Sequence, residues 1–140
     1  MKTALLLMFV GCIHAHAGIV ALTILAEARG EGKDGMAAVA CVIAQRAENR
    51  SITPEKVCLQ RWQFSCWNGK TEADLLHLYS SKMAPWALYL ERNITRMNRA
   101  KIGNADHYYA DYIQAPYWAR GKKPVAIVGK HKFYRLNNEN

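Results

Sequence analysis

The sequence predicts an α+β fold class: a mainly helical domain with a small antiparallel β-sheet towards the C-terminus. Between about residues 19 and 100, apolar residues recur at helical spacing. After Gly103, short segments rich in β-branched and aromatic residues replace this pattern. No repeat, low-complexity tract or linker interrupts the chain after residue 17, so we expect a single domain over residues 18–140.

The N-terminal segment, residues 1–17, has the features of a secretory signal peptide. A positive start at Met1-Lys2 precedes an apolar stretch over residues 4–13 and a small-x-small site at Ala15-His16-Ala17. We therefore expect cleavage after Ala17 and export to the periplasm, cell wall or medium. A lipoprotein signal at Cys12 and a retained membrane anchor are the alternatives, but a poor lipobox and polar interruptions disfavour them.

The first expected helix covers about residues 19–29 and is apolar nearly all round, so it should be central and buried. A polar turn over residues 30–35 follows. A second helix is expected over residues 35–49, with apolar residues at helical spacing and a polar end at Gln45, Arg46 and Glu48.

The next elements are shorter. Thr53-Pro54-Glu55 has the residues of a helix start, and residues 60–69 form an aromatic loop. Helices are then expected over about residues 72–80 and 85–100. Three segments predict strands of a small sheet: residues 106–110, 124–128 and 132–135.

The charge of the chain favours an anionic partner. The formal net charge is +8, and removal of Lys2 with the signal peptide leaves 18 Lys and Arg against 11 Asp and Glu, or +7. Nucleic acid, acidic lipid and an acidic cell wall would all suit this charge, and export argues against nucleic acid. After processing we expect no stable membrane insertion.

Three cysteines remain after processing: Cys41, Cys58 and Cys66. In an exported protein this odd number suggests one disulfide and one buried thiol. Cys58 and Cys66 flank a short loop and are the expected pair, whereas Cys41 lies in an apolar helical segment. No cysteine or histidine spacing is typical of a metal site, so we expect neither a metal nor a cofactor.

Glu27 is the first candidate for chemistry. Eight residues that are apolar except for Thr23 lead to this carboxylate, which is costly beside an apolar helix unless it is paired or used. Its apolar neighbours and the negative end of the helix dipole both favour the protonated form that a general acid needs. A surface glutamate paired with Arg29 is the alternative, and Glu31 in the polar turn is a weaker candidate.

Other candidates combine aromatic rings with polar groups, which suits sugar binding as well as ordinary packing. They lie in the segment Gln63 to Gly69 and in two expected strands that contain His107 and His131. Cys66 with either histidine could form a nucleophilic pair, which a disulfide at Cys66 would forbid.

The order of these motifs resembles that of the SleB/CwlJ family of bacterial cell-wall hydrolases, which includes spore-cortex-lytic enzymes. The motifs that carry the resemblance extend over nearly the whole chain after residue 17: residues 26–31 (AEARGE), 35–40 (GMAAVA) with the helix to Arg46, 63–66 (QFSC), 107–108 (HY) with 116–119 (PYWA), and 128–134 (VGKHKFY). Gln45 and the Gly32-Lys33 turn depart from the family pattern.

The resemblance implies a lysozyme-like, monomeric enzyme that cleaves peptidoglycan glycan strands with Glu27 as the catalytic acid. It implies that the substrate-binding residues are Phe64, Ser65, Tyr108, His131 and Tyr134. Glycosidases commonly use a second carboxylate, for which only Glu31, Asp106 and Asp111 are available nearby. A lone acid fits a lytic transglycosylase, so we expect that reaction. A hydrolytic muramidase, an amidase and a non-catalytic wall-binding module are the alternatives.

Overall fold

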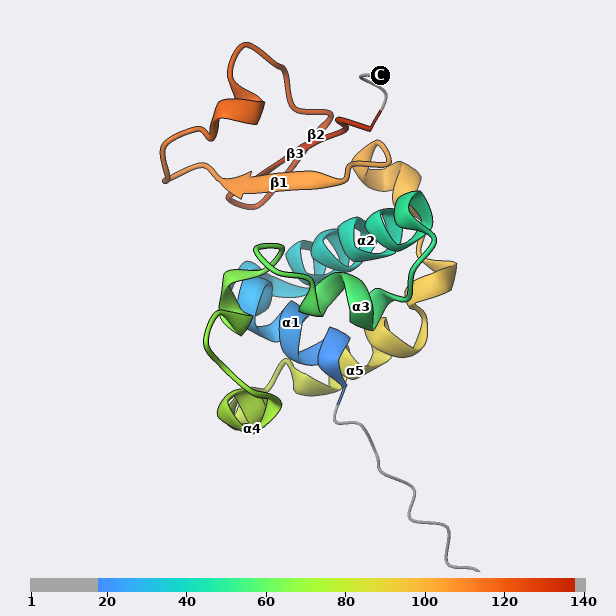
Figure 1. The fold of residues 1–140 in the computed structure, drawn as a ribbon, viewed down its shortest axis with the longest axis vertical. Helices are drawn as coiled ribbons and strands as arrows, with labels where there is room; N and C mark the ends of the chain where they lie inside the picture. The colour runs from blue at the N-terminus through green and yellow to red at the C-terminus, as the bar shows by residue number, and fades with distance from the viewer. Residues whose placement is uncertain (1–17, 138–140) are drawn as a thin grey trace, which may run out of the picture.

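The computed structural model describes residues 18–137, and the expected signal peptide lies outside this range. Figure 1 shows a layer of helices with a three-stranded sheet stacked against it, on the side of helix α2 (Gly32–Arg50). This arrangement confirms the α+β fold class. Among residues 18–137, no helix is long and apolar enough to cross a membrane.

The two N-terminal helices form the centre of the helical layer. Helix α1 (Ile19–Ala28) is buried along most of its length, as its apolar composition predicts, and packs against α2, α3 (Pro54–Leu59) and α5 (Ala84–Arg92). A single 3-10 turn, η1 (Arg29–Glu31), joins α1 to α2. The expected polar turn is therefore shorter than predicted, because α2 begins at Gly32 rather than at residue 35.

The segment between α2 and α5 is held by local caps and by long-range hydrogen bonds from Trp67 and Tyr79. Helix α3 starts as predicted, with the Thr53 side chain accepting the Lys56 N–H. The loop that follows contains the 3-10 turn η2 (Ser65–Trp67), and its Trp67 indole donates to the Thr23 hydroxyl of α1 at 2.9 Å. Thr23, the one polar residue in the apolar run, thus positions this loop.

The rest of the helical layer is wound less regularly than the sequence predicts. The expected helix over residues 72–80 consists of α4 (Glu72–Leu75) and the 3-10 segment η3 (Leu76–Ser80). The long helix expected over residues 85–100 is wrong: α5 ends at Arg92, and the 3-10 segments η4 (Ile94–Arg96) and η5 (Arg99–Ile102) follow. The Asn93 side chain donates to the Tyr89 carbonyl, and such local bonds compete with helix continuation.

The sheet has the antiparallel order β1-β3-β2, from strands β1 (His107–Ala110), β2 (Ala126–Val128) and β3 (His131–Tyr134). All three strands were predicted. Tyr108 is paired with Phe133, and the Phe133 ring is fully buried in a cluster with Ala38 and Val42 of α2. This packing fixes the sheet on the helical layer.

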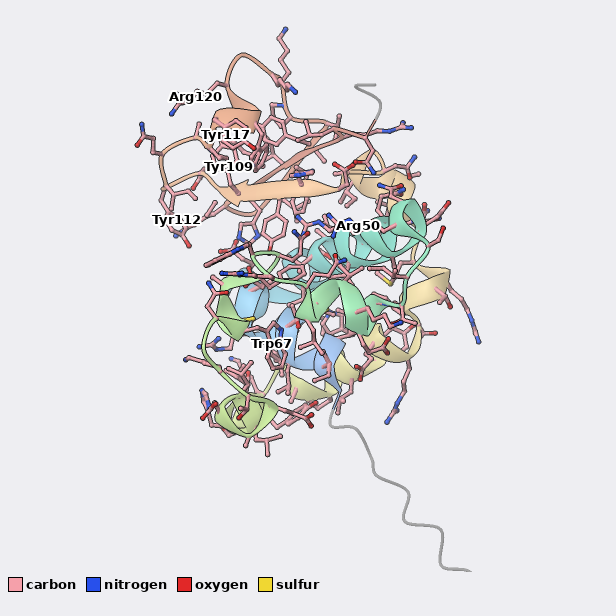
Figure 2. All side chains as sticks on the ribbon, in the orientation of Figure 1. Arg50, Trp67, Tyr109, Tyr112, Tyr117 and Arg120 are labelled. Atoms are coloured by element: carbon pink, nitrogen blue, oxygen red, sulfur yellow. The ribbon has the colours of Figure 1, made fainter. Side chains whose placement is uncertain are left out.

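The opposite face of the sheet is covered by the long connection between β1 and β2. Tyr109 and Tyr134 stack there with ring centres 5.8 Å apart, and Trp118 of the 3-10 turn η6 (Tyr117–Ala119) packs edge-on against both rings. Figure 2 shows Tyr109, Tyr112 and Tyr117 together in this outer part of the molecule.

Asp106 anchors the start of β1 to the end of the described chain. Its buried carboxylate accepts the Leu136 and Asn137 N–H groups at 3.0 and 3.1 Å and contacts the His107 ring at 2.8 Å. Burial alone would raise the pKa of Asp106, but these hydrogen bonds and the His107 charge together lower it.

We expect Asp106→Asn to lower the free energy of unfolding by about 1–3 kcal/mol at pH 6, because several donors lose a charged acceptor. A lowered folded-state pKa means that this contribution is present above the unfolded pKa of about 4 and is lost as pH falls through the folded pKa. Urea unfolding of both proteins checks this: the difference should shrink on acidification. A difference that grows towards low pH would contradict it.

Candidate functional site

Glu27 lies on the last turn of α1, where the buried helix reaches the surface between the two layers. Its side chain is partly exposed, and its Oε2 accepts the Tyr108 hydroxyl at 2.7 Å. Arg29 is exposed and donates to the Leu25 carbonyl. The structure therefore pairs Glu27 with Tyr108 of the sheet, and not with Arg29 as the alternative interpretation expected.

Tyr108 connects the sheet to this carboxylate. Its ring lies 5.0 Å from the His131 ring and 5.6 Å from the Phe133 ring, so the side chain is held between its strand neighbours. Burial, followed by the negative charge of Glu27, raises the pKa of Tyr108 well above its usual value. The phenol therefore remains protonated, and it is a permanent hydrogen-bond donor to Glu27.

Arg46 of α2 lies next to this pair and was missed as a site residue. Its guanidinium is buried, its Nε donates to the Asp106 carbonyl at 2.7 Å, and it lies 5.2 Å from the Phe64 ring centre. Its Nη1 is buried without a partner among residues 18–137. Burial lowers the pKa of Arg46, whereas the neighbouring Tyr108 and the carboxylates of Asp106 and Glu27 raise it.

The sequence pattern placed Arg46 in the polar end of the second helix, so its burial beside Glu27 was not expected. Arg46 follows Val39 by seven residues and Ile43 by three, so it continues the buried face of α2. The helical pattern predicts an apolar residue at position 46. The arginine there was the sequence signal for a buried charge.

The Cys58–Cys66 disulfide expected from the sequence is not formed. Both residues are free thiols: Cys58 is buried, and Cys66 is partly buried near Glu27. Cys41 is a buried thiol, as predicted.

The partly buried Cys66 thiol lies near the Glu27 carboxylate. Burial, with the negative charge of Glu27, raises the pKa of Cys66 to about 12. A thiol in this state is not a nucleophile at neutral pH, because the thiolate is the reactive form. The raised pKa therefore disfavours a cysteine–histidine pair.

We expect iodoacetamide at pH 8 to alkylate Cys66 in the folded protein at least about a hundredfold more slowly than in the unfolded chain. The raised pKa leaves little thiolate at this pH, and the fraction rises only towards pH 12. Mass spectrometry of native and urea-treated samples measures both rates. Rapid alkylation of Cys66 in the native enzyme would restore the nucleophile hypothesis.

Glu31, the candidate second carboxylate, contacts the turn between β2 and β3. Its Oε2 accepts the Lys130 N–H at 3.0 Å. A β-carbon at Gly129 would collide with this carboxylate, and Gly129 also has a φ of 56°. The positive φ favours glycine at this position, and a larger residue would displace the Glu31 carboxylate. Glu31 thus ties the hairpin to the start of α2.

The remaining predicted site residues separate into two groups. Phe64 is buried under Arg46, Ser65 is exposed at the start of η2, and His131 is buried with its Nδ1 unpartnered among the described residues. These three come from the segments that surround Glu27. Tyr134 does not: it lies on the outer face of the sheet, packed under Trp118, because alternate residues of β3 face opposite sides.

The loop that carries Phe64 and Ser65 is fixed to α1 through Trp67, whose position against the helical layer is visible in Figure 2. Residues 18–137 contain no group of three or more His, Cys, Asp or Glu side chains arranged to hold a metal ion.

Comparison with known proteins identifies the family. The family model for cell wall hydrolases matches residues 30–134, so the chain belongs to the cell wall hydrolase family and degrades peptidoglycan. No curated protein and no solved structure gives a significant match. The matched region begins just after Glu27 and contains its neighbours Arg46, Phe64, Cys66 and Tyr108.

Proposed function

We propose that this cell wall hydrolase is an exported, monomeric lytic transglycosylase that cleaves the bond between N-acetylmuramic acid and N-acetylglucosamine. Glu27 protonates the bridging oxygen, and the bond from that oxygen to C1 of N-acetylmuramic acid breaks through an oxocarbenium-like transition state. The 6-hydroxyl of the same sugar then bonds to C1, and the Glu27 carboxylate accepts its proton. The products are a free 4-hydroxyl on N-acetylglucosamine and a 1,6-anhydro end.

The observation that carries the proposal is the Glu27–Tyr108 hydrogen bond at 2.7 Å, which holds one carboxylate at the junction of the two layers. The Cys66 thiol lies near the same carboxylate. The Tyr108 hydroxyl can still donate to Glu27 after Glu27 has given its proton to the leaving group. The same bond holds the carboxylate when it accepts the proton of the attacking hydroxyl, so it suits both halves of the reaction.

Two of the other candidate carboxylates, Glu31 and Asp106, have hydrogen-bond partners, which supports a single-acid mechanism. Glu31 accepts the Lys130 N–H, and Asp106 is buried with three donors around it. Asp111 is exposed just beyond β1, where its backbone N–H extends the pairing with Lys130. An enzyme that activates water needs a free carboxylate facing the acid.

Arg46 supplies a positive charge beside this pair of side chains. Its Nε donates to the Asp106 carbonyl and its guanidinium lies over the Phe64 ring, and these two contacts fix its position. The partial charge that develops on Glu27 during proton transfer is therefore met by a preorganised cation. His131, Tyr108, Phe64 and Ser65 would contact the sugar rings and their acetamido groups.

Exposed aromatic rings and positive charge suit an extended acidic glycan. Trp62, Tyr112 and Tyr117 are 71%, 73% and 83% exposed, although such rings are normally at least partly buried. Flat rings of this kind stack on sugars. The charge of +7 expected after export would attract the acidic wall.

Digestion of purified peptidoglycan, followed by mass spectrometry of the soluble fragments, tests the proposal. We expect fragments that end in 1,6-anhydro-N-acetylmuramic acid. Reducing N-acetylmuramic acid ends would show a hydrolytic muramidase, and reducing N-acetylglucosamine ends would show cleavage of the other glycosidic bond. Free stem peptides would show an amidase. Unchanged glycan would show a binding module.

A further inference from the structure

Glu91 of α5 places its carboxylate at the N-terminus of α1. Its Oε1 accepts the Val20 N–H at 3.1 Å and the Ala21 N–H at 3.4 Å, across about seventy residues of sequence. A helix N-terminus has free N–H groups and a positive partial charge, so a carboxylate is favourable there. Glu91 therefore fixes the start of the helix that ends in Glu27.

The same carboxylate lies against Gly18, the residue that follows the expected cleavage site. A β-carbon at position 18 would overlap the Glu91 carboxylate, so a larger residue there would displace this side chain. The backbone nitrogen and the β-carbon position share one Cα, which puts the Gly18 nitrogen within roughly 4.5 Å of a Glu91 oxygen. The Tyr79 hydroxyl donates to the Gly18 carbonyl at 3.3 Å and holds this residue in place.

Glu91 has no cationic partner among residues 18–137. Lys82 and Arg92 line the same hollow, which has a volume of about 700 Å³, yet neither lies within ion-pair distance of Glu91 there. Burial raises the pKa of Glu91, and the two helix N–H groups and the more distant charge of Arg92 only partly oppose this effect. A half-buried carboxylate of this kind is stabilised by a nearby positive charge.

We propose that the peptide bond between Ala17 and Gly18 is hydrolysed during export and that the new Gly18 α-ammonium forms an ion pair with Glu91. Hydrolysis adds one water across that bond, leaving a carboxylate on Ala17 and an amine on Gly18 that is protonated at neutral pH. The pair joins the mature N-terminus to α5 and fastens the first turn of α1. This inference concerns maturation and does not depend on which bond the enzyme cleaves.

The first test locates the cleavage site. The full chain is expressed with its own leader in a bacterial host, and the intact mass and N-terminal sequence of the exported protein are determined. We expect a chain that begins at Gly18. A mature chain that begins at any other residue, or one that retains the leader, would overturn the proposal.

The second test measures the ion pair in the exported protein. Acetylation under mildly acidic conditions modifies the α-amine before lysine side chains, since its usual pKa is about 8 against about 10.4 for lysine. We expect acetylation to lower the melting temperature of the wild type by about 3 °C or more and to have little further effect in Glu91→Gln. That variant retains an amide oxygen to accept the helix N–H groups.

Glu55→Gln is the matched control, because Glu55 is an exposed carboxylate whose charge acts on Glu91 without contacting Gly18. Acetylation should lower its melting temperature as much as that of the wild type. An equal effect in all three proteins, or none in the wild type, would show that the α-ammonium does not pair with Glu91. Because the readout is stability, this result is separate from the outcome of the peptidoglycan digest.

Discussion

Replacing Glu27 with glutamine is expected to lower the rate of peptidoglycan cleavage by about a thousandfold, since general acid catalysis contributes 10²–10⁴-fold and here one group serves as both acid and base. The amide keeps the shape of the side chain and can still accept the Tyr108 hydroxyl, so the fold should persist. Release of soluble fragments measures the rate, and thermal unfolding confirms that the variant is folded.

Glu31→Gln is the matched control for this experiment. The new amide oxygen can still accept the Lys130 N–H, so the hairpin contact is retained while the charge is lost. We expect its activity to stay within about tenfold of the wild type, since the interactions of a solvent-exposed charge contribute little free energy in water. Full activity of Glu27→Gln would refute the assignment of the acid, and a collapse of activity in Glu31→Gln alone would support a hydrolytic muramidase.

Tyr108→Phe is expected to lower activity by roughly ten- to a hundredfold, because a hydrogen bond to a charged group contributes about 1.5–3 kcal/mol. Loss of the donor leaves the Glu27 carboxylate without the contact that positions it. Activity on purified peptidoglycan and thermal unfolding are measured with wild type and variant side by side. A purely structural role would lower the melting temperature together with the activity.

Tyr109→Phe is the control for the sheet. Tyr109 is the next residue of β1, but its ring lies on the outer face with Tyr134 and Trp118. We expect this variant to keep wild-type activity. Equal losses in the two variants would mean that the Tyr108 hydroxyl acts only through the stability of the sheet.

Local patterns predicted the elements that carry the site. The apolar run of α1, the Thr53 cap and the three strand segments are encoded by neighbouring residues, and the structure confirms them. The predicted helix over residues 85–100 was wrong because a side-chain hydrogen bond competes with the helix there. The Asn93 side chain bonds the Tyr89 carbonyl at the point where α5 ends, eight residues before the predicted end.

Long-range contacts decided the rest. Burial of Arg46 depends on the Asp106 carbonyl, sixty residues away, and Glu31 contacts a turn ninety-nine residues away. Neither contact has a local signal in the sequence. The resemblance implied that Tyr134 lies in the site, but a motif does not show which face of a strand a side chain occupies, which the register determines. The predicted disulfide between Cys58 and Cys66 was wrong for a similar reason, because the spacing of cysteines in the sequence does not show their geometry in the fold.

The central claim is that Glu27 acts alone and directs attack by the substrate's own hydroxyl. Digestion of peptidoglycan in H₂¹⁸O tests this claim most directly. Intramolecular attack adds no water, so each new anhydro end should be lighter than a hydrolysed end by one water and should contain no solvent oxygen. Mass spectra of the first fragments released by the wild type give the result. New ends that carry one ¹⁸O per cleaved bond would contradict the account and show that the enzyme activates water.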